Sequence, residues 1–224
     1  MKLVCFDLDD TLYPERQFVL SGFGAVAHWV QNQLGMAHFY RELLKAFDEG
    51  IRGRTFNIAL ERLGIACSDE LVEALVSVYR LHKPEIQLFA DASAALQHLH
   101  GRYSLAIITD GILQTQRNKV AALGIEPVFD RIIYTSAYNP PCPKPSAHSY
   151  EALMRRFRVE GDDCIYVGDN PMKDFHAPHH LGWHTARVLR TASVRQSSCD
   201  ENSESDYQEA DIKIRSLAEL SEVI

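Results

Sequence analysis

Short apolar runs that end in polar turns recur along the chain, and they limit the possible folds more than any other feature. Their apolar character is continuous rather than alternating, which is typical of strands covered on both faces of a sheet. Helical patterns lie between most of them, as expected for parallel strands joined by crossover helices. The sequence therefore predicts an α/β fold with a doubly wound parallel sheet, with strands at Lys2–Phe6, Ser104–Ile108, Arg131–Tyr134, Cys164–Val167 and Thr185–Val188.

The interval between the first and second predicted strands holds amphipathic helical patterns and no convincing strand. Ordinary crossover connections are much shorter than this interval. We therefore expect a helical cap at residues 14–84, inserted into an α/β core formed by residues 1–13 and 85–224. The predicted cap helices are Phe18–Leu34, His38–Gly50, Thr55–Leu63 and Asp69–Tyr79.

Beyond the cap, the sequence predicts further elements of the core. A helix is expected at Asp91–His100, with Ala94, Leu96 and Leu99 toward the sheet. Residues 193–209 are dominated by Ser, Asp, Glu, Gln and Asn, a composition typical of a solvated loop. An edge strand and a closing helix are expected after this loop, at Ala210–Ile214 and Leu217–Ile224.

Composition and charge exclude several classes of protein. The chain has 224 residues, of which 46% are hydrophobic, and this length and content are ordinary for a globular protein. Its 23 Lys and Arg against 30 Asp and Glu give a net charge of -7, which argues against a nucleic-acid polymer or an anionic membrane as partner. No apolar stretch suits a membrane span or a signal peptide, and the five cysteines are scattered. We therefore expect a cytoplasmic protein with reduced cysteines, either a monomer or a homodimer.

Two carboxylates follow the first predicted strand. Asp7 and Asp9 are two residues apart, and such residues point the same way in an extended segment. Two neighbouring carboxylates repel each other unless a cation or a shared proton neutralises them, so a divalent metal with oxygen ligands is expected, and Mg²⁺ fits best. The alternative is that Asp7, Asp9 and Asp10 are only turn formers.

Two later segments add groups that suit an anion. Thr109-Asp110-Gly111 places a hydroxyl and turn amides after the second strand, where backbone amides can face an anion, although Thr109 or Asp110 could instead cap a helix. Lys144 lies between two prolines that restrict the backbone and could hold its ammonium in one place. The alternative for Lys144 is an ordinary solvated lysine.

The fourth predicted strand leads into Gly168-Asp169, with Asp174 five residues after Asp169. Asp169 would complete a three-carboxylate cation site with Asp7 and Asp9. Asp174 could orient Lys144 or cap a helix. Together these residues place carboxylates, a hydroxyl and a lysine at consecutive strand ends, where open α/β sheets bind ligands.

These residues resemble the four motifs of the haloacid dehalogenase-like phosphohydrolases in order and in spacing. The likeness covers nearly the whole chain, including the helical cap after the first motif. It rests on Asp7-Leu8-Asp9-Asp10-Thr11, Thr109, Lys144-Pro145 and Gly168-Asp169 with Asp174.

The resemblance implies a role for each carboxylate. Asp7 would be the nucleophile, and Asp9 the general acid and base. The side chains of Asp7 and Asp169 and the backbone carbonyl of Asp9 would bind Mg²⁺, with Asp174 in support. The true dehalogenases that resemble this scaffold lack an acid at the position of Asp9, so cleavage of a carbon-halogen bond is disfavoured.

The resemblance also implies a reaction and a class of substrate. Lys144, Thr109, Asp110 and Gly111 would bind the phosphate. The expected activity is Mg²⁺-dependent hydrolysis of a small soluble phosphomonoester, a sugar phosphate or a nucleotide-type metabolite, through an aspartyl-phosphate. A cap over the cleft would shut out large substrates, which favours phosphorylated metabolites over phosphoproteins.

Three alternatives to a phosphatase remain at the level of sequence. A phosphomutase would pass the same aspartyl-phosphate to a second sugar hydroxyl. A phospho-receiver module also combines a phosphorylatable Asp with an acidic pair and a Lys-Pro, but such modules are about half this length and lack the cap. A degenerate member of the family would bind a ligand without turnover.

Two further groups of residues are candidates for binding. Arg52 and Arg54, which flank Gly53 in the predicted cap, are candidates for contact with the substrate beyond its phosphate, or are solvated arginines. A histidine cluster near the fourth strand could be a second metal site, but surface histidines are favoured because Pro178 and Leu181-Gly182 interrupt the helical spacing. The cluster comprises His176, His179, His180 and His184.

Overall fold

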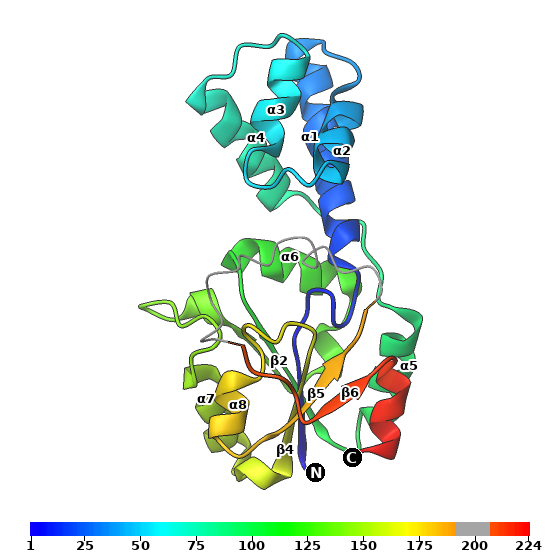
Figure 1. The fold of residues 1–224 in the computed structure, drawn as a ribbon, viewed down its shortest axis with the longest axis vertical. Coiled ribbons are helices and arrows are strands. Elements are labelled where there is room, and N and C mark those ends of the chain that lie inside the picture. Colours follow the sequence, from blue (N-terminus) through cyan, green and yellow to red (C-terminus); the bar gives the residue numbers. More distant parts are fainter. Residues whose placement is uncertain (191–206) are drawn as a thin grey trace. The chain divides into compact units, whose positions relative to one another are not determined.

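The computed structural model describes residues 1–190 and 207–224. Its sheet has six parallel strands in the order β3-β2-β1-β4-β5-β6, so the chain runs outward from β1 in both directions (Figure 1). The predicted doubly wound α/β fold is confirmed. The strands are β1 (Leu3–Phe6), β2 (Ser104–Thr109), β3 (Arg131–Tyr134), β4 (Cys164–Gly168), β5 (His184–Val188) and β6 (Ile212–Ile214).

The structure divides into two compact units. One comprises Met1–Glu15 and Gln87–Ile224 and contains the sheet, and the other, Arg16–Ile86, contains only helices. The helices of the first unit are α5 (Ala90–Leu99), α6 (Leu113–Leu123), α7 (His148–Phe157) and α8 (His176–His180), with short 3₁₀ helices η1 (Glu126–Val128), η2 (Thr135–Ala137), η3 (Gly161–Asp163) and η6 (Leu217–Glu222).

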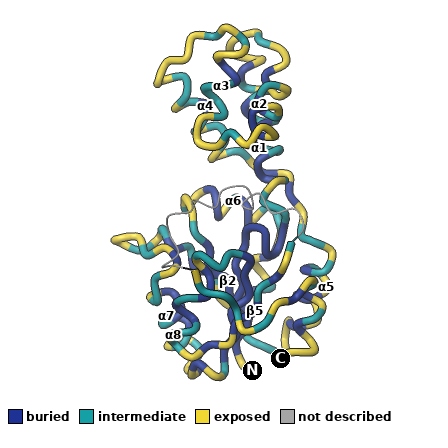
Figure 2. Tube along the Cα trace, in the orientation of Figure 1, coloured by how far each residue is buried: buried dark blue, intermediate teal, exposed yellow. Residues whose placement is uncertain are grey.

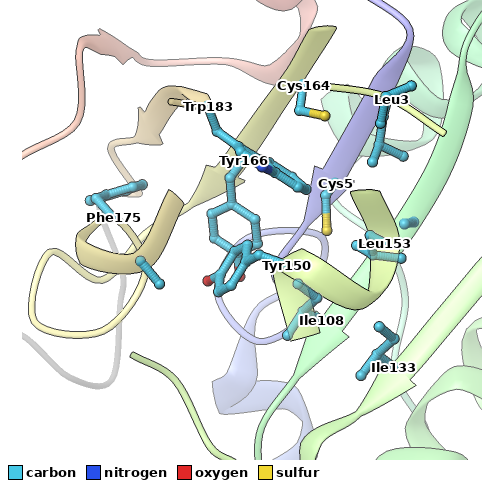
Figure 3. Close-up of a cluster of buried hydrophobic side chains, with 13 residues drawn as sticks. Leu3, Cys5, Ile108, Ile133, Tyr150, Leu153, Cys164, Tyr166, Phe175 and Trp183 are labelled. Atoms are coloured by element: carbon cyan, nitrogen blue, oxygen red, sulfur yellow. The ribbon is translucent and has the colours of Figure 1, made fainter. Parts of the chain in front are cut away.

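All four residues of β1 are buried, as expected for a central strand covered on both faces (Figure 2). Alternate residues of a strand point to opposite faces, and Leu3 and Cys5 face the helices α7 and α8. Figure 3 shows this layer, in which the rings of Tyr150 and Trp183 lie edge to face with centroids 5.5 Å apart. The sheet is therefore held against α7 and α8 by close-packed aliphatic and aromatic side chains.

The structure corrects three details of the sequence prediction. In α5, Leu96 and Leu99 are buried as predicted, but Ala94 is exposed, because Ala92 and Ala95 occupy the buried face instead. The closing helix is the 3₁₀ helix η6, which begins with a capping box between Ser216 and Glu219. The predicted edge strand is shorter and begins at Ile212.

Most of the predicted polar loop at residues 193–209 lies outside the described residues. Four cysteines are described, and all four are free thiols. Within the described ranges, the helices are all too short or too polar to cross a membrane.

The helical unit contains α1 (Glu15–Leu34), which begins at the boundary, and then α2 (Phe39–Asp48), α3 (Thr55–Arg62) and α4 (Asp69–Leu81). Aromatic rings form much of its interior: Phe23 lies against Phe47 and Tyr79, with centroids 5.8 and 6.1 Å away. Ser68 caps α4 by accepting a hydrogen bond from the backbone amide of Leu71. The unit therefore has a core of its own.

Close packing between α1 and α4 makes the two glycines of α1 respond differently to alanine. A Cβ at Gly22 would lie 2.5 Å from ring atoms of Tyr79, whereas a Cβ at Gly24 would meet nothing within 4 Å. We expect Gly22→Ala to lower the free energy of unfolding by about 1–3 kcal/mol through overpacking. Gly24→Ala should raise it by up to about 1 kcal/mol, because alanine favours the helix.

Urea unfolding of the full chain, followed by circular dichroism, measures both variants. Because the two substitutions add the same methyl group to the same helix, Gly24→Ala is the matched control. Equal effects in the two variants would contradict the packing of α1 against Tyr79.

Candidate functional site

The site lies where the strand order reverses, at the carboxyl ends of β1 and β4. These strands are neighbours, with Phe6 paired to Val167, and the amide of Asp7 donates a hydrogen bond to the carbonyl of Val167 at 2.9 Å. Asp7 follows β1 directly, and Asp169 follows β4. The topology therefore brings both carboxylates to the edge of the sheet at which open α/β proteins bind ligands.

Lys144 is the cation at the centre of this site. Its side chain is 4% exposed, and its ammonium donates to Oδ1 of Asp7 at 2.5 Å, to Oδ1 of Asp174 at 2.8 Å and to the hydroxyl of Tyr166 at 3.0 Å. Burial by itself lowers the pKa of the Lys144 ammonium, but the carboxylates of Asp174 and Asp7 outweigh it, and the pKa lies well above its usual value. The ammonium is therefore charged throughout the physiological range.

Three carboxylates gather beside Lys144. Asp7, Asp169 and Asp174 each offer one oxygen atom, and these atoms lie within 4.8 Å of one another. Oxygen donors of this kind suit a hard divalent cation such as Mg²⁺. Oδ2 of Asp174 accepts a hydrogen bond from the backbone amide of Asn170 at 2.9 Å, and Oδ1 of Asp174 faces Lys144.

Gly168 gives Asp174 the room it needs. A Cβ at Gly168 would lie 2.4 Å from Oδ2 of Asp174. A larger residue at this position would therefore displace the carboxylate from the site.

The carboxylate cluster of the described residues comprises Asp7, Asp169 and Asp174 and does not include the side chain of Asp9, and a role for Asp9 as a metal ligand stays a prediction. The prediction assumed an extended backbone, but β1 ends at Phe6, and a turn follows in which the amide of Leu12 donates to the carbonyl of Leu8. The same-side rule for alternate residues no longer holds there. Asp174 takes the place in the cluster that was expected for Asp9.

Asp9 instead accepts hydrogen bonds from Tyr13, Gln116 and Lys119. Its Oδ1 accepts from the ammonium of Lys119 at 2.7 Å and from the hydroxyl of Tyr13, and its Oδ2 accepts from the amide nitrogen of Gln116 at 3.0 Å. Burial is the main cause that raises the pKa of the Tyr13 hydroxyl well above its usual value, and the charge of Asp9 is the second cause. The hydroxyl therefore stays protonated and can donate to Asp9. All of these side chains are buried.

The segment after β2 has the geometry of a turn and does not cap a helix with its side chains. Thr109 ends β2, Gly111 has φ of +124°, and α6 begins only at Leu113 without a side-chain cap. The hydroxyl oxygen of Thr109 accepts from Gln116 at 2.5 Å. Oδ1 of Asp110 accepts from the hydroxyl of Thr135 at 2.7 Å and from the amide of Lys144 at 3.2 Å, so it joins this turn to the loop that carries Lys144.

The profile of the haloacid dehalogenase-like hydrolases matches residues 1–182. The chain belongs to this family. Glyceraldehyde 3-phosphate phosphatase of Methanopyrus kandleri is 27% identical over 199 residues, which cover 85% of this chain and 84% of that protein. Among enzymes of the family, this chain therefore has phosphatases as relatives.

Solved structures of the same fold include hydrolases of several kinds. The 2-haloacid dehalogenase of Pseudomonas syringae superposes with a TM-score of 0.63 at 24% identity, covering 100% of this chain and 97% of the other. The HAD-hydrolase YfnB of Bacillus subtilis, bound to magnesium, superposes with a TM-score of 0.65 at 18% identity, and the match covers 99% of this chain and 97% of that protein. At these identities the likeness establishes the haloacid dehalogenase fold and not the reaction.

The two arginines proposed for substrate contact lie in the helical unit of this hydrolase. Arg52 donates to the carbonyls of Phe47 and Ile51, and its guanidinium lies 3.8 Å from the centre of the Phe47 ring. Arg54 forms an ion pair with Glu61 at 3.5 Å. A role for Arg52 and Arg54 in binding stays a prediction.

The four histidines do not gather as metal ligands. Among the described residues, the only group of metal-binding side chains is the carboxylate cluster. His176 and His180 stack on each other, whereas His179 contacts Thr185 and Asp211. His184 is exposed. The favoured interpretation, surface histidines, fits His180 and His184, which are exposed, whereas His176 and His179 are half-buried.

Sequence reasoning missed four residues of the site: Tyr13, Gln116, Lys119 and Tyr166. The spacing of Gln116 and Lys119 was a usable signal, because residues three apart share a helix face, and both lie on the face of α6 that includes the buried Val120. Tyr13 and Tyr166 gave no such signal in the sequence, and only the structure shows their hydroxyls beside Asp9 and Lys144.

Removal of the buried cation should destabilise the protein. Lys144→Met would leave the carboxylates of Asp7 and Asp174 buried without their cation, and we expect a loss of about 3 kcal/mol in the free energy of unfolding. Urea unfolding in the presence of EDTA measures this loss without help from a metal. Lys2→Met is the control, because the exposed pair of Lys2 with Asp163 should contribute less than about 1 kcal/mol. Equal stability of Lys144→Met and the parent would contradict the charge balance between Lys144 and the carboxylates of Asp7 and Asp174.

Proposed function

We propose that this hydrolase is a Mg²⁺-dependent phosphatase that transfers the phosphoryl group of a small metabolite to Asp7 and then to water. The observation that carries the proposal is the contact of the Lys144 ammonium with Asp7, beside a cluster of three carboxylates at the strand ends. A cation next to a buried nucleophilic carboxylate is what attack on an anionic phosphate requires.

The charges of the site support this reaction. A phosphomonoester dianion and the Asp7 carboxylate repel each other, so positive potential must be supplied where they meet. Lys144 supplies one charge, and the turn amides after Thr109 can add hydrogen bonds. The oxygen atoms of Asp7, Asp169 and Asp174 fit Mg²⁺, with the backbone carbonyl of Asp9 as a further proposed ligand. A bound Mg²⁺ would neutralise charge on the carboxylates and on the phosphate.

Asp9 is the proposed general acid and base. In the first step an oxygen of Asp7 bonds to phosphorus, the bond from phosphorus to the leaving oxygen breaks, and Asp9 gives that oxygen a proton. In the second step Asp9 takes a proton from the water that hydrolyses the aspartyl-phosphate. One carboxyl group can serve both steps because it alternates between its two protonation states.

The proposed substrate is a small phosphorylated metabolite. The Methanopyrus kandleri relative is named a glyceraldehyde 3-phosphate phosphatase, which supports substrates of this size and chemistry. A panel of sugar phosphates, triose phosphates and nucleotides, assayed with Mg²⁺ and with EDTA, tests the proposal. Release of inorganic phosphate without an added acceptor would separate the phosphatase from a phosphomutase. Mg²⁺-independent turnover, or none at all, would contradict the proposed function.

The first step depends on the oxygen nucleophile of Asp7. We expect Asp7→Asn to lose at least about 10³-fold in kcat, because an amide is a poor nucleophile, while the fold persists. Phosphate release and circular dichroism measure the two effects. Asp163→Asn is the matched control, since Asp163 pairs with the exposed Lys2, and it should retain the rate of the parent. Turnover by Asp7→Asn at the parent rate would disprove the mechanism.

A further inference from the structure

The buried face of α6 carries two polar side chains, Gln116 and Lys119, that take no part in the two proposed reaction steps. Gln116 and Lys119 are 2% and 4% exposed. Burial of an amide or an ammonium is costly unless the group is hydrogen-bonded or paired. Both side chains contact Asp9, one at each carboxylate oxygen. The burial of these groups is therefore compensated at the carboxyl group proposed as the general acid.

Gln116 also contacts the turn proposed to bind phosphate. Its amide nitrogen lies 3.0 Å from Oδ2 of Asp9 and 2.5 Å from the hydroxyl oxygen of Thr109. In the structure the nitrogen of the Gln116 amide, rather than its oxygen, faces both Oδ2 of Asp9 and the hydroxyl oxygen of Thr109. The Thr109 oxygen then accepts a hydrogen bond from Gln116, and the proton of the Thr109 hydroxyl is not used in that bond.

The turn is shaped to admit this side chain. A Cβ at Gly111 would lie 3.3 Å from the amide group of Gln116, which is tighter than ordinary packing. The glycine therefore leaves room for Gln116 to reach both Asp9 and Thr109. Lys119, one helical turn along α6, completes the support of Asp9 from the same face.

We propose that Gln116 and Lys119 are positioning residues that hold the Asp9 carboxyl group at the leaving oxygen, and that Gln116 also turns the Thr109 hydroxyl proton toward the phosphoryl group. This inference rests on the proposed function. Neither residue exchanges a proton with the substrate. Both act through the place and direction of the groups that they contact.

Substrates with different leaving groups can distinguish a misplaced Asp9 carboxyl group from a general loss of folded protein. When the oxygen of Asp7 bonds to phosphorus, an alkoxide leaving group needs the proton of Asp9, whereas 4-nitrophenolate departs as a stable anion without one. A misplaced Asp9 should therefore slow transfer from an alkyl phosphate more than transfer from 4-nitrophenyl phosphate. The ratio of the two kcat/KM values reports this first step, and a general loss of folded protein leaves the ratio unchanged.

The test compares Gln116→Leu and Lys119→Met with matched variants on the exposed side of α6. Gln114→Leu removes an amide and Arg117→Met removes a cation from exposed positions of α6, and both variants should keep the parent ratio. We expect the ratio of alkyl to 4-nitrophenyl kcat/KM to fall by about tenfold or more in Gln116→Leu and Lys119→Met, within the usual contribution of general acid catalysis. Lys119→Arg, which keeps a cation for Asp9, should recover most of the ratio.

Inorganic phosphate gives a second readout that distinguishes the two residues. Gln116→Leu removes the donor to Thr109, so the inhibition constant of inorganic phosphate should rise severalfold. Lys119→Met leaves Thr109 untouched and should not change this constant.

Equal losses on both substrates, or an unchanged ratio, would overturn the inference while leaving the phosphatase in place. If Gln116→Leu fails to fold by circular dichroism, the comparison of Lys119→Met with Lys119→Arg decides alone. If Lys119→Met fails to fold, the comparison of Gln116→Leu with Gln114→Leu decides. A parent protein that hydrolyses neither substrate would overturn the proposed function itself, and the inference with it.

Discussion

The ammonium of Lys144 lies buried between the carboxylates of Asp7 and Asp174, and the arrangement of the site depends on that balance of charge. A buried lysine keeps its proton only when carboxylates surround it, and carboxylates this close together need a cation. Each partner comes from a different segment, so the charge balance requires the sheet order that places β4 beside β1. Tyr166 accepts a further hydrogen bond from the ammonium, and its ring packs edge to face against Tyr150 of α7.

The net charge of -7 and an anionic substrate are compatible because the local field differs from the total. Lys144 is buried beside Asp7, where the phosphate is proposed to react, whereas the charge of Lys119 is paired with Asp9. A proposed Mg²⁺ at Asp7, Asp169 and Asp174 would add its charge to that of Lys144. The same carboxylates that make the chain acidic thus gather the cations that a phosphate requires.

The sequence predicts the sheet and most strand-end residues because both depend on local patterns. Continuous apolar runs indicate buried parallel strands, and the residues that follow such strands must meet at one edge. The direction of the Asp9 side chain was not predictable, because alternation holds only while a strand continues, and β1 ends at Phe6. Gln116 and Lys119 were missed for another reason: a polar residue in a helix is usually solvated, and a shared helix face does not by itself show that both residues are buried.

The central claim is that Asp7 itself carries the phosphoryl group during turnover. Acid quenching in the steady state, followed by borohydride reduction and mass spectrometry of the peptides, tests it most directly. An acyl phosphate at Asp7 is reduced to homoserine, whereas a free carboxylate is not. We expect homoserine at position 7 only in samples quenched with substrate and Mg²⁺. Conversion at another residue, or none at position 7 although the phosphoenzyme is shown to accumulate, would contradict the account.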